Sequence, residues 1–367
     1  MEESRYMERA VRLAQKGLGW VNPNPLVGAV IVKDGRIIGE GYHRKCGDLH
    51  AERNAIASLT ESAAGAVMYV TLEPCCHYGR TPPCTEAIIE QKIAKVVVGS
   101  KDPNPQVAGK GIETLRRAGI EVVEDFMKDE CDQLNPVFFH YITTKTPYLV
   151  MKYAMTADGK IATKTGASRW ITGEKARMAV HEMRHAYMGI MAGIGTVLAD
   201  DPMLNVRLSG KKSPVRIICD SRLRIPEDSR ICKTAQEYRT IVACGSLEQE
   251  TKKKAAALEK LGIQVVSFPG STGKVDLKRL MEYLGSQGID SILLEGGAGL
   301  NDSALQAGIV KEIKVFMAPK IFGGEAAPGP VEGIGIEETD QAVFLELENI
   351  SRMGEDILME YRVKSGD

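Results

Sequence analysis

A chain of 367 residues is long for one domain and predicts two, because roughly 150 residues per domain is usual. The hydrophobic share of 44% and charged share of 26% are ordinary for a globular protein, and the net charge of −1 provides no overall basic field for nucleic acid or an anionic membrane. Met1-Glu2-Glu3 is not followed by a basic region and an apolar run, so we expect no secretory signal, and the longest apolar stretch, around 188–199, is too short to cross a bilayer. We therefore expect a cytoplasmic protein without nucleic-acid or membrane partners.

The first part of the chain alternates between helical and strand patterns. Apolar residues from Met7 to Leu18 recur at helical spacing, and two β-rich runs are joined by Asp34-Gly35, a strong hairpin signal. In chain order we expect a helix ending near residue 18, strands at 27–33 and 36–42, a helix from about 50, a strand at 67–71, a helix after residue 84, a strand at 95–99, a helix at 110–118, a strand at 120–123 and a helix from about 128 to 141.

A second alternation follows a linker candidate at 143–147. We expect a strand at 148–155, a hairpin-like segment at 156–163, a helix at 173–184, and strands at 189–192, 215–220, 240–244, 264–268, 291–295 and 312–318. Such alternation predicts mixed sheets with helices on both faces. The predicted domains are residues 1–144 and 148–367.

The most informative motif is His50-Ala51-Glu52 followed by Pro74-Cys75 and Cys84. One imidazole and two thiolates hold a zinc ion with its fourth position open, and a carboxylate two residues after the histidine is suited to proton transfer. This order is typical of zinc deaminases of nucleobases. We predict His50, Cys75 and Cys84 as ligands and Glu52 as the catalytic acid and base. The cysteines are separated by eight residues instead of the usual two, which indicates a particular kind of deaminase.

A structural zinc site is the alternative interpretation. It would need a fourth ligand, and Cys46, Cys76, His43 and His77 are all near enough in sequence. We favour catalysis because a structural site does not require the glutamate. We favour Cys75 over Cys76 as the ligand because Cys75 follows the proline of the motif.

The longer motifs make a family resemblance specific. Residues 24–28 (Asn-Pro-Leu-Val-Gly), 71–84, 102–105 and 107–111 resemble the bifunctional riboflavin biosynthesis deaminase/reductase. The resemblance covers essentially the whole chain. It implies a cytidine-deaminase-like three-layer αβα domain that deaminates a diaminopyrimidinone ribosylamino 5′-phosphate, followed by a reductase domain that reduces the ribose to ribitol with NADPH.

The same resemblance implies which residues bind the substrate of the deaminase. Asn24 contacts the pyrimidine edge and His43 lies near that pocket, while His77 and Arg80 face the ribose phosphate. Arg80 stands where the family often has lysine, which keeps the charge and changes the donor geometry. Asn24 before Pro25 also fits a simple turn residue, and a lone histidine such as His43 proves little by itself.

In the second domain, no predicted strand is followed by the dinucleotide-binding fingerprint G-x-G-x-x-G. Residues 193–205 and Glu295-Gly296-Gly297 instead resemble the family's reductase half, whose fold is like dihydrofolate reductase. Lys152 is assigned a catalytic role on the substrate nitrogen. The resemblance implies substrate contacts from Ser168, Arg184, Leu204, Arg207 and Glu295, and NADPH contacts from Ala154, Trp170, Thr196, Asp200, Ser221, Gly296, Gly297 and Ser303.

Three other readings compete with this one. A nucleoside or tRNA deaminase with an unrelated reductase-like domain is disfavoured by the stretched cysteine spacing and the lack of basic bias. A non-catalytic zinc-stabilised binding module leaves Glu52 without a role, and a free-standing folate reductase leaves the zinc motif unexplained. The family also suggests a homo-oligomer joined through the reductase domains.

Overall fold

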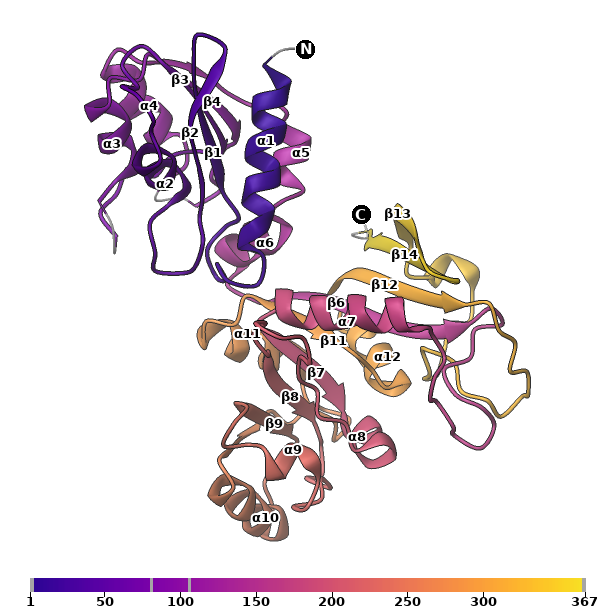
Figure 1. The fold of residues 1–367 in the computed structure, drawn as a ribbon. Coiled ribbons are helices and arrows are strands. Elements are labelled where there is room, and N and C mark those ends of the chain that lie inside the picture. Colours follow the sequence, from indigo (N-terminus) through magenta and orange to yellow (C-terminus); the bar gives the residue numbers. More distant parts are fainter. Residues whose placement is uncertain (1–2, 80–81, 105–106, 365–367) are drawn as a thin grey trace. The chain divides into compact units, whose positions relative to one another are not determined.

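The computed structural model describes residues 3–79, 82–104 and 107–364 (Figure 1). Two units, Met1–Lys145 and Thr146–Asp367, make up the chain. Each unit is built on one β-sheet of the described residues, with five strands in the first and nine in the second. Within the described ranges, no helix has the length and apolar character needed to span a membrane.

The first unit carries its sheet in the order β2-β1-β3-β4-β5. Strands β2, β1 and β3 are antiparallel neighbours, whereas β3, β4 and β5 run parallel. Its elements are α1 (Ser4–Ala14), η1 (Gln15–Gly17), β1 (Gly28–Lys33), β2 (Arg36–Tyr42), α2 (Ala51–Ala57), β3 (Val67–Leu72), α3 (Cys84–Glu90), β4 (Lys95–Ser100), α4 (Lys110–Arg117), β5 (Glu121–Val123), α5 (Lys128–Asp132) and α6 (Pro136–Thr144).

Alternating side chains of this sheet pack into two separate cores. On β1, Val30 joins a cluster with Met7 of α1 and Cys131 of α5, while Ile31 joins one with Ala55 of α2 and Leu115 of α4. This period of two places helices on both faces of the sheet, which makes three layers. The predicted αβα architecture is confirmed.

The second unit carries its sheet in the order β10-β9-β8-β7-β11-β6-β12-β14-β13. The pairs from β10 to β12 are parallel, whereas β14 pairs antiparallel with both β12 and β13. Its elements are β6 (Tyr148–Thr156), α7 (Glu174–Ala186), β7 (Gly189–Gly193), α8 (Ile194–Asp200), β8 (Val215–Cys219), α9 (Arg230–Lys233), β9 (Thr240–Cys244), α10 (Gln249–Lys260), β10 (Ile263–Ser267), α11 (Leu277–Ser286), β11 (Ser291–Leu294), α12 (Ala298–Gln306), β12 (Val310–Ala318), η2 (Thr339–Gln341), β13 (Leu345–Met353) and β14 (Asp356–Val363).

Helices again cover both faces of the second sheet. Leu280 of α11 and Ala304 of α12 pack in one core, whereas Leu258 of α10 and Val197 of α8 belong to another. Val180 of α7 packs separately on Phe316 of β12. This arrangement leaves the carboxyl ends of the parallel strands as a common edge, where ligands usually bind in open α/β sheets.

Two local predictions were wrong. The expected continuous helix from 128 to 141 is broken into α5 and α6, because Pro136 begins a new helix and Asn135 is non-helical. The Asn135 side chain is committed to Leu26, accepting from its N–H at 2.8 Å and donating to its carbonyl at 2.9 Å. The hairpin-like segment at 156–163 forms a turn instead, and Lys160 and Ile161 bond to residues 327 and 328.

Candidate active sites

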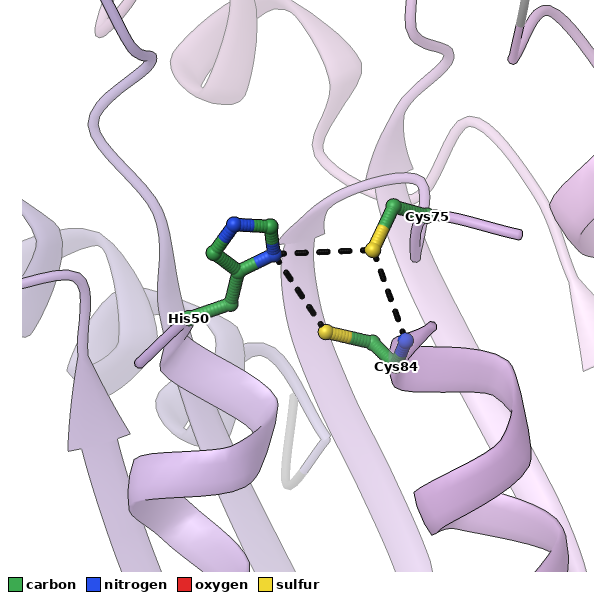
Figure 2. Close-up of side chains that lie close together, drawn as sticks. All are labelled: His50, Cys75 and Cys84. Atoms are coloured by element: carbon green, nitrogen blue, oxygen red, sulfur yellow. Dashed lines mark hydrogen bonds between the residues drawn. The ribbon is translucent and has the colours of Figure 1, made fainter. Parts of the chain in front are cut away.

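The three predicted metal ligands converge at two helix starts and one turn of the first unit (Figure 2). His50 is the N-cap of α2, Cys84 is the first residue of α3, and Cys75 lies in the turn after β3. The Nδ1 atom of His50 is 3.5 Å from the sulfur of Cys75 and 3.5 Å from that of Cys84. The ring and both sulfurs point toward one another in Figure 2.

This donor set fits zinc. A tetrahedral ion with Zn–N near 2.1 Å and Zn–S near 2.3 Å would hold nitrogen and sulfur about 3.6 Å apart, close to the separations seen. The three ligand atoms lie within 4.8 Å of one another, and among the described residues no other histidine, cysteine or carboxylate joins the group. Cys46, Cys76, His43 and His77 therefore provide no fourth ligand in this arrangement. A zinc ion held by these three residues would therefore keep one coordination position open.

Hydrogen bonding prepares Cys75 to act as a thiolate. The Cys84 thiol and the His50 imidazole both lower the pKa of Cys75, and the Cys84 backbone N–H donates to its sulfur at 3.4 Å. Donation to Cys75, together with burial, raises the pKa of Cys84. Zinc binds cysteine as the thiolate, so an ion held here would take up both sulfurs and release any thiol proton.

Glu52 stands one residue beyond the first position of α2 and is only 3% exposed. Burial raises the pKa of this carboxyl, and the nearby Cys75 raises it further. A carboxyl held in a water-poor position beside the ligand group can retain a proton and release it. That property is what proton transfer in a deamination requires.

Asn24 and His43 form a second polar pair near the ligand group. The His43 Nδ1 lies 3.1 Å from the Leu49 carbonyl, which can only accept, so Nδ1 carries the hydrogen. Its Nε2 then accepts from the Asn24 amide at 3.1 Å. Burial lowers the pKa of His43 and favours this neutral form, and its ring lies 5.4 Å from that of His50. Among the described residues no group donates to the Asn24 side-chain carbonyl, which can therefore accept from a ligand.

The segment between the two cysteines is held from α2 and α3. Arg53 donates to the Pro82 carbonyl at 3.1 Å and to the Pro83 carbonyl at 2.9 Å, directly before Cys84. The Tyr78 hydroxyl is 2.9 Å from the Glu86 carboxylate. His77 is exposed, and Arg80 lies outside the described residues. We did not predict Arg53 from sequence, because nothing in its local pattern indicates which carbonyls it reaches.

Glu73, which the sequence analysis likewise did not predict, holds the turn that carries Cys75. Its buried carboxylate accepts hydrogen bonds from backbone N–H groups of the β4–α4 connection and the start of α4, namely those of Asp102 (3.4 Å), Gly109 (2.9 Å), Gly111 (3.0 Å) and Ile112 (3.3 Å). A carboxylate at a helix N-terminus satisfies unpaired donors there. Glu73 thereby joins the end of β3 to α4.

Gly111 makes the contact between α4 and this turn possible. A Cβ atom there would lie 2.1 Å from the Pro74 carbonyl oxygen, so Gly111→Ala must displace the residue before Cys75. We expect the free energy of unfolding to fall by about 1–3 kcal/mol, as for other overpacked sites, and zinc retention to fall with it. Thermal denaturation and zinc content after dialysis measure both. Glu113→Ala, on an exposed position of the same helix, should change neither; equal losses in both variants would contradict this account.

In the second unit, Arg184 and Glu295 pair with each other. The Arg184 Nε and Nη2 atoms donate to the two Glu295 carboxylate oxygens at 2.5 and 2.8 Å, and Nη1 donates to the Asn205 carbonyl at 3.0 Å. Arg184 lowers the pKa of Glu295 to about 2 despite burial. Both side chains were predicted to contact substrate, and the structure presents them as one charged pair.

Lys152 on β6 lies in the field of that pair. Burial lowers the pKa of Lys152, Glu295 opposes the shift and Arg184 reinforces it. His181 of α7, absent from the sequence prediction, is also close to the group: its Nδ1 accepts from the Arg207 backbone N–H at 3.4 Å. Burial and the two arginines lower the pKa of His181 to about 4. The site thus combines a half-buried lysine, an ion pair and a neutral histidine.

The residues predicted to bind NADPH follow the carboxyl ends of neighbouring strands. Thr196 comes after β7, Ser221 after β8 and Gly296 after β11, while Ala154 lies near the end of β6. Gly297 is the N-cap of α12, and a Cβ there would meet only the Thr196 hydroxyl, at 3.4 Å. The helix N-terminus is therefore open to a phosphate.

Other predicted residues of this half have different surroundings. Ser168 donates to Asp200 at 3.3 Å, Trp170 is 60% exposed, and Ser303 turns back to the Gly299 carbonyl at 2.8 Å. Leu204 is buried in a core cluster. Because Ser303 already donates within its helix, its hydroxyl adds no free donor to a phosphate site in this structure.

Comparison with known proteins agrees with both halves of this geometry. Residues 1–100 match the cytidine and deoxycytidylate deaminase zinc-binding region, and residues 147–359 match the RibD C-terminal domain. A riboflavin biosynthesis protein RibD from Actinobacillus pleuropneumoniae is 55% identical over 365 residues, covering 100% of this chain and 96% of that protein. The chain belongs to the RibD family. The resemblance predicted from its motifs is confirmed, and so is the fold class of both halves.

Two solved structures of the family extend the similarity to the whole fold. RibD of Acinetobacter baumannii (form 1) is 37% identical with a TM-score of 0.87, and the match covers 99% of each chain. A diaminohydroxyphosphoribosylaminopyrimidine deaminase/5-amino-6-(5-phosphoribosylamino)uracil reductase from Thermotoga maritima is 39% identical, also with a TM-score of 0.87 and 99% coverage of each chain. Both domain types of the RibD family are therefore present in this chain.

Proposed function

We infer that the protein is a bifunctional enzyme of riboflavin biosynthesis. It deaminates 2,5-diamino-6-ribosylamino-4(3H)-pyrimidinone 5′-phosphate and then reduces the ribosyl chain with NADPH to give 5-amino-6-ribitylaminouracil 5′-phosphate. The observation that carries this inference is the open His50, Cys75 and Cys84 group beside buried Glu52, in a chain that matches RibD proteins over its full length.

In the deaminase, zinc supplies Lewis-acid activation of the attacking water. Glu52 takes a proton from that water and passes it to the departing amine, a role supported by its burial and raised pKa. Asn24, oriented by neutral His43, offers its carbonyl to the pyrimidine edge. His77 and Arg80, by resemblance, are proposed to face the ribose phosphate, where positive charge and N–H donors suit the ligand.

In the reductase, NADPH supplies the hydride. The open N-terminus of α12 after Gly296-Gly297 seats a cofactor phosphate beside Thr196, and Trp170 and Asp200 are proposed as further cofactor contacts. Lys152 donates a proton to the substrate nitrogen as hydride reaches C1′ of the opened ribosylamine. The Arg184–Glu295 pair holds the substrate beside Lys152, and Arg207 provides positive charge for its phosphate.

Mass spectrometry of the diaminopyrimidinone ribosylamino-phosphate tests this function. Incubation with zinc-loaded protein alone should replace the ring amine by oxygen, and addition of NADPH should then add two hydrogens to the ribose. Return of the substrate unchanged by zinc-loaded protein would contradict the deaminase. It would instead favour a zinc site that only supports a binding module.

We also propose that the chain acts as a cytoplasmic homo-oligomer joined through its reductase domains. All eight cysteines are free, which suits a reducing compartment. Strand β13 is the outer strand of its sheet, and its apolar residues Leu345, Leu347 and Ile350 are 36%, 51% and 58% exposed. They pair with Val363, Tyr361 and Met359 of β14, which pack against the core of the second unit. The apolar face of the sheet therefore extends from this core to the outer edge formed by β13.

A second copy of this chain is the occupant we propose for that edge, since an antiparallel strand can pair with its own symmetry mate. Leu347→Glu is expected to shift the mass measured by light scattering toward the monomer, because a charge would then be buried at the interface. The control Glu346→Gln alters an exposed neighbour and should leave the mass unchanged. A wild-type protein that is monomeric at micromolar concentration would overturn the proposal.

A further inference from the structure

The connection after β12 crosses the edge of the second unit where the reductase residues gather. Residues 319–332, here named the post-β12 loop, bond to the turn after β6, to the Trp170 segment and to the start of α12. Each of these segments lies beside residues proposed to bind NADPH or substrate. A single loop thus links three parts of one site that are far apart in the sequence.

Lys320 connects this loop to the Trp170 segment. Its Nζ atom donates to the Trp170 carbonyl at 3.0 Å and to the Ile171 carbonyl at 2.8 Å. The Lys320 carbonyl accepts from the Ala157 N–H at 2.8 Å. One residue therefore joins the Trp170 backbone to the turn after β6, and Trp170 itself is 60% exposed.

Asp158 holds the same loop from the other side. One carboxylate oxygen accepts from the Gly323 N–H at 2.7 Å, and the other accepts from the Phe322 N–H at 3.2 Å and the Thr156 hydroxyl at 2.5 Å. These hydrogen bonds lower the pKa of Asp158 to about 2, so the carboxylate stays ionised at neutral pH. Gly323 has a φ of 62°, a backbone conformation that suits glycine.

The far end of the post-β12 loop reaches the start of α12. The Asn301 amide donates to the Pro330 carbonyl at 2.8 Å, and the Glu332 N–H donates to the Ala298 carbonyl at 3.3 Å. Between the two ends, Lys160 donates to the Ala327 carbonyl at 2.8 Å. The N-terminus of α12 is the proposed phosphate-binding site, and the Trp170 segment is also proposed to contact NADPH. The post-β12 loop therefore connects two parts of the proposed cofactor site.

We propose that Lys320 and Asp158 are positioning residues of the reductase, which fix the Trp170 segment and the post-β12 loop in the geometry that receives NADPH. The inference rests on the proposed function and adds two residues to it. Neither side chain reaches the reacting atoms; both act through backbone groups of the segments they hold. Misplacing a binding segment by about 1 Å is enough to weaken catalysis strongly.

Lys320→Met removes both donated hydrogen bonds while keeping side-chain length. We expect the KM for NADPH to rise on the order of tenfold, the scale of losing hydrogen bonds to a charged group, with a smaller change in kcat. Lys320→Arg, which can still donate to two carbonyls, should recover most of the affinity. Lys278→Met removes an exposed lysine of α11 and should behave as wild type. Steady-state kinetics with varied NADPH and the deaminated substrate provides these values.

A second variant tests whether the two residues act together. Asp158→Asn places an amide N–H₂ against backbone donors and should raise the same KM. Because both residues hold one loop, the double variant should lose less than the product of the single effects. Deaminase turnover in each sample reports any general failure of folding.

The outcomes separate this inference from the proposed function. If the wild type reduces its substrate and Lys320→Met leaves the KM for NADPH unchanged, the positioning role is overturned and the function stands. Equal loss of reductase and deaminase activity would also overturn it, by indicating a purely structural role. If the wild type reduces nothing with NADPH, the proposed function itself fails. Selective loss of NADPH affinity with rescue by arginine supports the inference.

Discussion

Replacing Glu52 with glutamine is expected to lower deaminase turnover by about 10²- to 10⁴-fold, the usual contribution of a general acid and base. The amide keeps the size of the side chain but cannot accept and release a proton. Glu52 is outside the group of three ligand atoms, so zinc content should stay at the wild-type level. Rates of amine loss measured by mass spectrometry, together with zinc content of the same samples, check the prediction.

The bifunctional chain contains its own control for this variant. Reductase activity on already deaminated substrate should be unchanged, because Glu52 belongs to the other unit. Glu90→Gln, an exposed glutamate at the end of α3, should leave both activities intact. Deamination at the wild-type rate by Glu52→Gln would show that Glu52 is no proton shuttle and would return the site to a scaffold role.

Local sequence signals predicted much of the fold because they act over a few residues. Asp34 and Gly35 both have positive φ values, 48° and 74°, which is the conformation that a tight hairpin turn requires. The helix predicted across Pro136 failed where a distant residue, Leu26, took the Asn135 side chain as its partner. Strands β13 and β14 were not predicted, although Leu345 and Leu347 alternate with Glu346 and Glu348 as in a strand with one apolar face.

The residues of the candidate sites also differ in whether local sequence signals predict them. His50, Cys75 and Cys84 were predictable because zinc chemistry restricts their types and order. Glu73 and Arg53 were not, since each acts on backbone groups 29 or more residues away, which any sequence can supply. Long-range contacts to backbone atoms leave no residue pattern. They are visible only once the elements are placed in space.

Replacing Lys152 with methionine is expected to lower reductase kcat by about 10²- to 10⁴-fold, because the substrate nitrogen would lose its proton donor. Methionine keeps the length and apolar stem of lysine on β6. The Arg184–Glu295 pair remains, so the substrate KM should change much less than kcat. Single-turnover reduction with saturating NADPH separates the chemical step from binding, and deaminase turnover serves as the internal control. Full reductase activity in Lys152→Met would dismiss the role.

The pH dependence gives Lys152 a signature of its own. Burial lowers the pKa of Lys152 below its ordinary value of 10.5, so the protonated donor is complete at low pH and is lost as pH rises through that lowered pKa. Wild-type reductase activity should therefore fall on the alkaline side, at a lower pH than an exposed lysine would give. Lys152→Arg keeps the charge but holds its proton too tightly, so its rate should be low without this alkaline fall. An identical alkaline limb in wild type and Lys152→Arg would assign the titration to another group and leave Lys152 only an electrostatic role.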